Sequence, residues 1–245
     1  MGKLIIAGIG PGDYDHMTIQ ADKALQACDV IIGYHVYVDL VKEHYPGKEY
    51  VTTPMTREAQ RCSMALKMAA DGKMVALVCS GDSGIYGMAA LVYELRGEAP
   101  EPEIQVVPGL TAASSGAALL GAPLTHDFAV ISLSDRLTDW AKIADRLAAA
   151  AQADLSIVLY NPVSKGRPDH LKKACDILLQ YLPGDRLCAI ARNIARDGEN
   201  RRLLTLAQLR DAEADMFCTV FIGNEMTKQI QDYMVTPRGY RDTEN

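Results

Sequence analysis

The chain has 245 residues, of which 49% are hydrophobic, so it is long and apolar enough for one large domain or two small ones with a buried core. Its formal net charge of −6 argues against nucleic acid as the main partner, because phosphate binding needs concentrated Lys and Arg. No apolar run approaches the roughly 20 residues that cross a bilayer, and the N-terminus lacks a signal-peptide layout, so we expect a cytoplasmic protein with no membrane role.

The first predicted element is a strand over residues 4–9 that leads into the glycine-rich turn Ala7–Asp13, "AGIGPGD". Such a turn brings the main chain close to a ligand. A dinucleotide is excluded, because the third glycine of its fingerprint would fall at Asp13, where a carboxylate would repel a pyrophosphate. No Gly-Lys-Ser/Thr phosphate loop follows, so we expect a ligand that is not held through phosphates.

Further strand-like runs alternate with helical periodicity along the whole chain, which predicts an α/β fold. The predicted strands are residues 4–9, 30–32, 74–79, 104–107, 129–133, 155–160, 187–191 and 219–222. Predicted helices include residues 56–71, which stop at Gly72, the segment from about Asp139 to Ala153, and the segment that Pro168 opens and Pro183 ends.

The segment Leu120–Pro123 interrupts a helix of small residues and predicts a boundary between two α/β domains, 1–120 and 121–245. We expect a ligand cleft between them, at the carboxyl ends of the strands. Three turns in the first half follow strands and open helices: residues 8–13, 80–87 and 108–113. Their main-chain donors and acceptors suit a ligand with an adenine, a ribose and an amino-acid end.

The six cysteines form no C-x-x-C pair, and most stand in apolar surroundings. We interpret them as reduced thiols of the core. The five histidines are scattered without an H-x-x-x-H spacing, so no protein-bound metal is expected.

Four segments together resemble the tetrapyrrole methylase family, the class III S-adenosylmethionine-dependent methyltransferases: "GIGPGD", "SGDSGIYGMA", "VVPGLTAASSGAALLGAPLTHDF" and "LYNP". The resemblance spans essentially the whole chain. It implies two α/β domains, S-adenosylmethionine as the co-substrate between them, and a homodimer.

Within the family, further segments resemble the branch that methylates C(17) of the ring: "GYHVYVDLV", "HDFAVISLSD", "LYNPVSKGRPDHL" and "TPRGY". This implies methyl transfer to a precorrin-3B or cobalt-precorrin-3 type tetrapyrrole, coupled to ring contraction, in cobalamin biosynthesis. The sequence leaves open whether the substrate carries cobalt.

The resemblance also implies which residues meet the cofactor. They are Pro11, Ser80, Gly81, Asp82, Ile85, Thr111, Ala112, Asn161 and a main-chain contact near Ile194. The chain departs from the family pattern at Ser83, where relatives often have proline, and at Ile194, where some have glycine.

Ring contraction needs proton transfers and therefore a general acid or base. The candidates are Tyr34, His35, His126, Asp127, Ser132, Ser134 and Asp135. Two hydroxyls and a carboxylate at one strand end would suit pyrrole N–H groups, whereas the plainer interpretations are a capped turn at His126-Asp127 and a solvent-facing strand at Ser132 and Ser134. Candidates for the substrate carboxylates are Arg57, Lys165, Arg167, Arg192 and Arg196.

Other functions stay open at this point. Gly81-Asp82-Ser83-Gly84 resembles the nucleophile segment of some hydrolases, which would require His126 or His170 as a partner. A non-catalytic module that binds S-adenosylmethionine and a corrin methyltransferase acting at another ring carbon are the remaining alternatives. The segment "HDFAVISLSD" disfavours a diphthine synthase, and together with the acidic balance it disfavours a ribosomal RNA methyltransferase.

Overall fold

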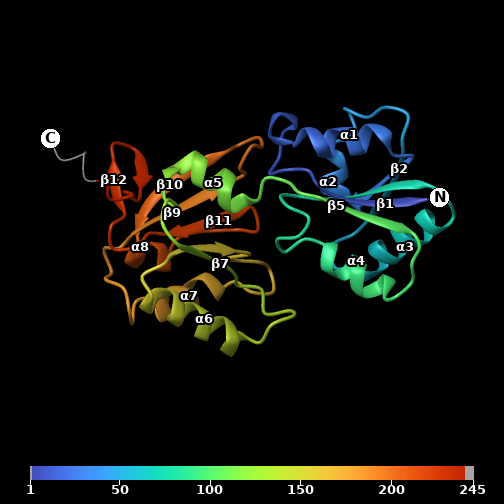
Figure 1. Cartoon of the computed structure of the whole chain (residues 1–245). Helices are drawn as coiled ribbons and strands as arrows, with labels where there is room; N and C mark the ends of the chain where they lie inside the picture. The colour runs from blue at the N-terminus through green and yellow to red at the C-terminus, as the bar shows by residue number, and fades with distance from the viewer. Residues whose placement is uncertain (1, 241–245) are drawn as a thin grey trace. The chain divides into compact units, whose positions relative to one another are not determined.

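The computed structural model describes residues 2–240 and divides the chain into two compact units, Met1–Ala112 and Ala113–Asn245, called unit 1 and unit 2 below. Each unit is built on a five-stranded sheet with helices on its faces (Figure 1). The α/β prediction is therefore confirmed. The last residues of the predicted C-terminal domain, 241–245, lie outside the described part.

Unit 1 contains a fully parallel sheet in the order β3-β2-β4-β1-β5. Its strands are β1 Lys3–Gly8, β2 Val30–Tyr34, β3 Glu49–Thr53, β4 Met74–Cys79 and β5 Glu103–Val107. Its helices are η1 Tyr14–His16, α1 Ile19–Ala27, α2 His35–Asp39, α3 Glu58–Ala70 and α4 Ala89–Arg96.

Helices cover both faces of this sheet, which is why its central strands are apolar on both sides. Leu4 and Ile6 of β1 pack with α3 and α4, whereas Ile5 and Ala7 pack with α1 and α2. Figure 1 shows the two pairs of helices on opposite faces. The unbroken apolar run in the sequence is thus explained by burial on two sides.

Unit 2 has a mixed sheet in the order β10-β9-β11-β8-β7, in which only β7 and β8 are parallel neighbours. Its strands are β7 Phe128–Ser132, β8 Ser156–Tyr160, β9 Leu187–Arg192, β10 Asn200–Thr205 and β11 Cys218–Ile222. Its helices are α5 Ala112–Leu120, α6 Trp140–Gln152, α7 His170–Leu178 and α8 Leu206–Arg210. A small third sheet joins β12 Lys228–Ile230, β13 Tyr233–Val235 and β6 Gly121–Ala122.

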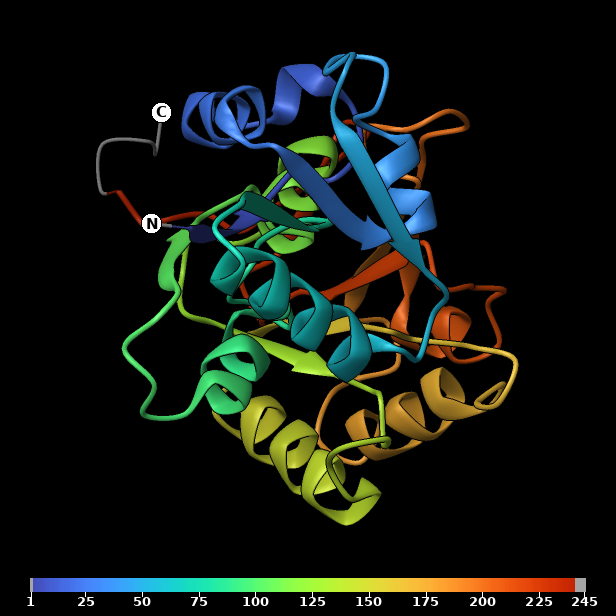
Figure 2. The ribbon, with the colours of Figure 1, turned by 90° about the vertical axis from the view of Figure 1, so that its right-hand side faces the viewer.

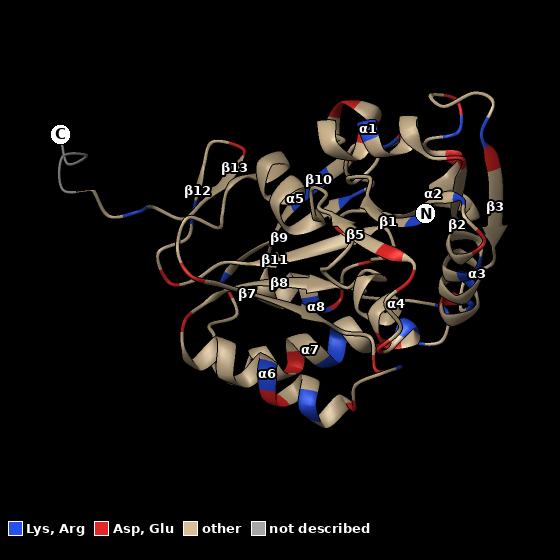
Figure 3. Cartoon of the chain, turned by 45° about the vertical axis from the view of Figure 1, so that its right-hand side comes forward, with Lys and Arg blue, Asp and Glu red and all other residues tan. Residues whose placement is uncertain are grey.

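Helices α6 and α7 pack side by side on one face of this sheet, as Figure 2 shows. The buried stripe of α6 includes Ile143 and Leu147, which join that core. Its outer face carries Lys142, Asp145 and Arg146, so both signs of charge are interspersed along it (Figure 3). The pattern is that of an amphipathic helix with a solvated outer face.

The division between the units falls after Ala112, eight residues before the predicted boundary at 120, so α5 belongs almost entirely to unit 2. Packing explains the difference. A Cβ on Gly116 of α5 would lie 2.8 Å from the Phe221 ring of β11, and the Ala113 N–H donates to the Tyr160 hydroxyl at the end of β8 (2.6 Å). Small residues let α5 approach the second sheet closely.

All eight predicted strands are present, although their ends differ by one or two residues in several cases. Strands β3, β6, β10, β12 and β13 were not predicted.

All six cysteines are buried and free, which confirms the core-thiol prediction. Burial raises the pKa of the Cys62 thiol to about 11. Among the described residues, no helix combines the length and apolarity needed to cross a membrane, and no cluster of three potential metal ligands is found.

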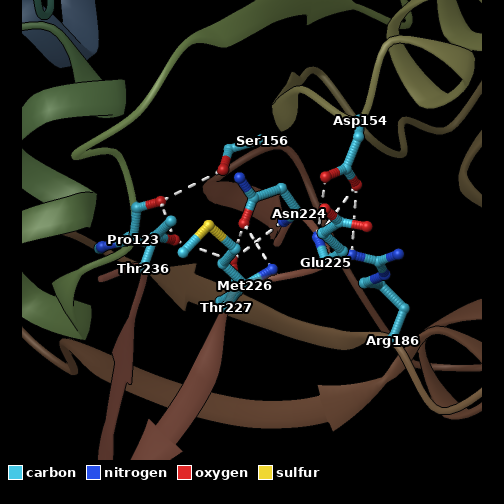
Figure 4. Close-up of polar contacts among 9 residues, drawn as sticks. All are labelled: Pro123, Asp154, Ser156, Arg186, Asn224, Glu225, Met226, Thr227 and Thr236. Atoms are coloured by element: carbon cyan, nitrogen blue, oxygen red, sulfur yellow. Dashed lines mark hydrogen bonds and ion pairs between the residues drawn. The ribbon is translucent and has the colours of Figure 1, made fainter. Parts of the chain in front are cut away.

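A buried polar network fastens the C-terminal segment to unit 2 (Figure 4). The Thr236 hydroxyl donates to the Pro123 carbonyl (2.7 Å) and lies 2.8 Å from the hydroxyl of Thr227. Thr227 in turn accepts from the Asn224 N–H (2.9 Å). Nearby, Asp154 accepts from the Glu225 N–H (2.9 Å) and pairs with Arg186 (3.4 Å).

We expect Thr236→Val to lower the free energy of unfolding by about 1–3 kcal/mol, because it leaves the buried Pro123 carbonyl and the Thr227 hydroxyl without this partner. Thr236 is buried, and valine has nearly its shape, so the change isolates the hydroxyl. The exposed Thr52 offers a matched control, for which Thr52→Val should change the unfolding free energy by less than about 0.5 kcal/mol. Equal denaturant midpoints for the two variants would contradict the expectation.

Candidate functional site

The three glycine-rich loops predicted to meet a ligand lie at neighbouring strand ends in unit 1. They follow β1, β4 and β5, which are adjacent and parallel in the order β4-β1-β5, so their carboxyl ends share one edge of the sheet. We call residues 8–13 loop 1, residues 80–87 loop 2 and residues 108–113 loop 3. The edge that they form is the usual ligand-binding edge of a parallel α/β sheet.

Main-chain contacts hold the three loops together. Gly10 and Gly81 exchange N–H···O bonds, with N to O distances of 3.1 and 2.7 Å. A Cβ on Gly109 would lie 2.1 Å from the Gly81 carbonyl oxygen, and a Cβ on Gly8 would lie 2.6 Å from the Gly109 nitrogen. Only residues without side chains allow the backbones to approach this closely.

The Asp82 carboxylate ties loop 2 to loop 3. Its Oδ1 accepts from the N–H groups of Gly84 (2.8 Å) and Ile85 (2.9 Å), and its Oδ2 accepts from that of Gly109 (2.9 Å). Because main-chain N–H groups bind both of its oxygens, the Asp82 carboxylate holds loops 2 and 3 in their conformation.

Ser83 has no solvent exposure, and its hydroxyl donates to the Val107 carbonyl (2.9 Å). A nucleophile must reach its substrate, so this placement argues against the serine-hydrolase alternative. Ser83 thus supports loop 2 from the inside, at the position where the sequence departs from the pattern that it resembles.

The structure brings the predicted cofactor residues of unit 1 onto these loops. Gly81 has φ +71° and lies against loop 3, where its Cβ position is 3.8 Å from the Thr111 Cα and 4.0 Å from the Ala112 nitrogen. Ile85 is 44% exposed although it is apolar. Pro11 is buried in loop 1, and Ser80 is half-buried at the start of loop 2. An exposed apolar side chain beside main-chain polar groups suits a flat, partly apolar ligand.

Tyr34 and His35 stand at the carboxyl end of β2, which neighbours β4 in the same sheet. The Tyr34 ring packs edge-on against His35 (centroids 4.4 Å apart) and against Tyr37 (5.2 Å). The predicted acid–base candidates of unit 1 are therefore part of an aromatic cluster on the ligand edge.

Unit 2 gathers polar side chains at the carboxyl ends of its two parallel strands, β7 and β8. The Asn161 amide donates to the Ser132 hydroxyl (2.9 Å), and the Arg167 guanidinium donates to the Ser134 hydroxyl. Asp135 Oδ1 lies 3.8 Å from the same guanidinium. The segment Ser132–Asp135 thus lies together with Arg167 and also with Asn161, a residue that the family resemblance assigns to the cofactor.

His170, which the sequence offers only as a possible partner of a hydrolase serine, joins this group. Its Nε2 lies 3.0 Å from Asp135 Oδ2. This hydrogen bond is the main cause that lowers the pKa of Asp135 below its ordinary value. Because the folded pKa is below the unfolded one, the pair stabilises the fold above about pH 4 and loses that contribution as the pH falls toward the folded pKa.

His126 is not part of this group. It precedes β7, whereas Ser132 ends that strand, so the whole strand, roughly 13 Å long, lies between them. Its Nε2 is buried without a hydrogen-bond partner among the described residues. The sequence predicts a shared role for His126 and the Ser132–Asp135 segment, but β7 separates them by its own length.

Four further predicted residues take separate places. Ile194 is buried and lies between Asn193 and Ala195, whose φ values are +53° and +55°. Arg192 forms an ion pair with Asp215 (2.8 Å). Arg57 and Lys165 are exposed, and neither forms an ion pair within the described part of the chain.

Comparison with known proteins matches residues 3–210 to the model of the "Tetrapyrrole (Corrin/Porphyrin) Methylases". The chain is 43% identical to a "Cobalt-factor III methyltransferase" of Priestia megaterium over 98% of its own length and 45% of that protein, so it spans about half of that relative. It is also 43% identical to a "Probable cobalt-factor III C(17)-methyltransferase" of Salmonella typhimurium, covering 97% of this chain and 99% of that one.

Among solved structures, that of the methyltransferase CobJ superposes with a TM-score of 0.90 at 36% identity, covering 97% of this chain and 100% of the other. The shared fold extends over both units. With a family model that matches most of its length and a full-length relative at 43% identity, the chain belongs to the tetrapyrrole methylase family.

Proposed function

We propose that this chain transfers a methyl group from S-adenosylmethionine to C(17) of a precorrin-3B or cobalt-precorrin-3 type tetrapyrrole, coupled to ring contraction, in cobalamin biosynthesis. The observation that carries the proposal is the 43% identity to the Salmonella C(17)-methyltransferase over nearly the full length of both chains. A cytoplasmic homodimer is part of the proposal on the family resemblance, and light scattering of the purified protein tests the dimer.

The three loops of unit 1 fit S-adenosylmethionine better than a nucleotide phosphate. They hold the apolar Ile85 at the surface and contain no Lys or Arg. We therefore expect the loops to bind the adenosine and amino-acid parts through backbone donors and acceptors. For the same reason NAD and ATP should bind poorly, since phosphates call for basic side chains.

When bound, the sulfonium group supplies a methyl that is already activated for transfer. The protein then needs no nucleophile of its own, and its task is to hold two reactants in line. Proximity and orientation supply up to roughly 7–11 kcal/mol in favourable cases. The close-packed glycine backbones of loops 1, 2 and 3 provide the rigid support that such positioning needs.

We propose that the β7 and β8 ends of unit 2 serve the tetrapyrrole. The 36%-exposed side chain of Asp135 offers lone pairs to pyrrole N–H groups, and the Arg167 guanidinium is of the type that pairs with ring carboxylates. The hydroxyls of Ser132 and Ser134 lie beside them, and each is already oriented by a neighbour, Asn161 or Arg167.

The function is tested by incubating the protein with S-adenosylmethionine and precorrin-3B or its cobalt analogue, followed by mass and NMR analysis of the product. The proposal predicts one added methyl group at C(17) and a contracted ring. Methylation at another carbon would support the alternative corrin methyltransferase, and binding of S-adenosylmethionine without turnover would support a non-catalytic module. The preferred substrate also decides between the metal-free and cobalt-bearing pathways.

Asp135→Ala should keep near-normal affinity for S-adenosylmethionine and lose about 100-fold or more of the methyl-transfer rate, because the macrocycle would lose a positioning contact. Calorimetry measures the affinity, and product mass measures the rate. Asp139→Ala removes an exposed carboxylate from the same connection between β7 and α6 and should behave as the parent protein. If Asp135→Ala keeps the parental rate and product, the Ser132–Asp135 segment has only a structural role.

A further inference from the structure

His170 is a buried histidine that faces the most exposed member of the unit 2 cluster. It is the first residue of α7 and is 7% exposed, and its Nε2 lies 3.0 Å from Asp135 Oδ2, 35 positions away in the chain. Its Nδ1 is buried and has no hydrogen-bond partner among residues 2–240. The tautomer that satisfies the site therefore carries its proton on Nε2 and donates it to Asp135, since a bare nitrogen is the less costly group to leave unpaired.

The imidazole ring is held in place from another side by Trp140. The two rings pack edge-to-face with centroids 4.8 Å apart, and Trp140 itself packs against the core of unit 2. Asp135 thus has one oxygen fixed by a buried donor and the other near Arg167, at 3.8 Å. One side of the Asp135 carboxylate is therefore open to solvent, and a buried hydrogen-bond donor holds the other side. The stability of an exposed loop does not require this arrangement.

We propose that His170 is a positioning residue of the methyl-transfer reaction: its Nε2–H orients the Asp135 carboxylate, so that the open face of Asp135 accepts pyrrole N–H groups of the tetrapyrrole. This proposal rests on the function proposed above. His170 itself touches no substrate and acts through Asp135, and the Trp140 ring limits the directions in which the imidazole can turn.

The hydrogen bond between His170 and Asp135 also controls the protonation of the Asp135 carboxylate. An ionised carboxylate accepts from pyrrole N–H groups on both oxygens, whereas a protonated one would present an O–H to them. The hydrogen bond from His170 lowers the pKa of Asp135, so removing the donor should raise that pKa. Within residues 2–240, the Arg167 guanidinium also lowers the pKa of Asp135, and it stays in place in His170 variants.

Two substitutions at His170 separate its role as a hydrogen-bond donor from its packing against Trp140. His170→Phe keeps a ring against Trp140 and removes the N–H, whereas His170→Gln keeps an N–H donor of similar reach. We expect His170→Phe to lower kcat by about 100-fold with little change in KM or in affinity for S-adenosylmethionine, as for a misplaced group. His170→Gln should recover at least part of that loss. His44→Phe, at an exposed histidine of unit 1, is the matched control.

A readout in the free protein makes the test independent of turnover. The 13C shift of the Asp135 carboxyl carbon should titrate at higher pH in His170→Phe than in the parent protein, and the acid limb of the kcat profile should move the same way. Combining His170→Phe with Asp135→Asn should cost no more than Asp135→Asn alone.

An unchanged Asp135 titration, a parental kcat in His170→Phe, or additive effects in the double variant would overturn the proposal. If the parent protein methylates no tetrapyrrole, the proposed function fails, and the positioning role in that reaction fails with it. The Asp135 titration would still show in that case whether His170 controls the carboxylate. Should His170→Phe fail to fold, His170→Met, which also removes the N–H donor, takes its place in the titration and in the double variant.

Discussion

Asp82→Ala is expected to weaken the binding of S-adenosylmethionine by about 100-fold or more, equivalent to about 2.7 kcal/mol. The carboxylate accepts three main-chain N–H groups, those of Gly84, Ile85 and Gly109. Hydrogen bonds to a charged group contribute about 1.5–3 kcal/mol each, and here they join two loops that are 27 residues apart in the chain. Without them, loops 2 and 3 lose the connection that gives the proposed binding surface its shape.

Calorimetry with S-adenosylmethionine measures this loss, and amide hydrogen exchange locates it. The N–H groups of Gly84, Ile85 and Gly109 should exchange faster in Asp82→Ala, whereas those of the β1 strand should not. Asp82→Asn retains one carbonyl oxygen and should lie between the parent and Asp82→Ala. Asp71→Ala removes an exposed carboxylate of the same unit and should bind as the parent does. Parental affinity together with unchanged exchange in Asp82→Ala would show that the loops keep their shape without it.

Sequence patterns predict every central strand of the two five-stranded sheets, but they miss two of the four edge strands, β3 and β10. The run Leu4–Ile6 is apolar because helices cover both faces of β1. By contrast β3, "EYVTT", and β10, "NRRLLT", are edge strands of the two sheets and carry charged or half-exposed residues. Edge strands tolerate such residues because one side has no neighbouring strand. Strand β6 has only two residues and exists through its pairing with β13, more than a hundred positions later, which no local pattern reveals.

The three glycine-rich loops could be predicted because glycine next to a strand end is a local signal. Their mutual contacts could not, since they depend on the sheet order that places β4, β1 and β5 side by side. The same holds for His170, which reaches Asp135 only because β7 and β8 are parallel neighbours and α7 follows the second of them. The sequence also grouped His126 with Asp135, and β7 separates the two by its own length.

Gly109→Ala is expected to destabilise unit 1 by about 3 kcal/mol or more, at the upper end of the usual cost of overpacking. The new methyl group would lie 2.1 Å from the carbonyl oxygen of Gly81 and 2.7 Å from the carbonyl carbon of Gly8. All of these neighbours are main-chain atoms, so no side chain can turn aside to make room. Relief requires loop 3 to move away from loops 1 and 2, and this would also break the Gly109 hydrogen bond to Asp82.

Gly84→Ala provides the matched control on loop 2. Its Cβ would meet no atom closer than 3.4 Å, which is ordinary contact with Asp82 Oδ1, and Gly84 is exposed. We expect its unfolding free energy to stay within about 0.5 kcal/mol of the parent value. Denaturant unfolding measures both variants, and calorimetry should show lost affinity for S-adenosylmethionine only in Gly109→Ala. If Gly109→Ala unfolds at the parental midpoint, the close approach of the three backbones is not what holds the ligand edge of unit 1 together, and the support for the loops must come from Asp82 and from the buried Ser83 hydroxyl bonded to Val107.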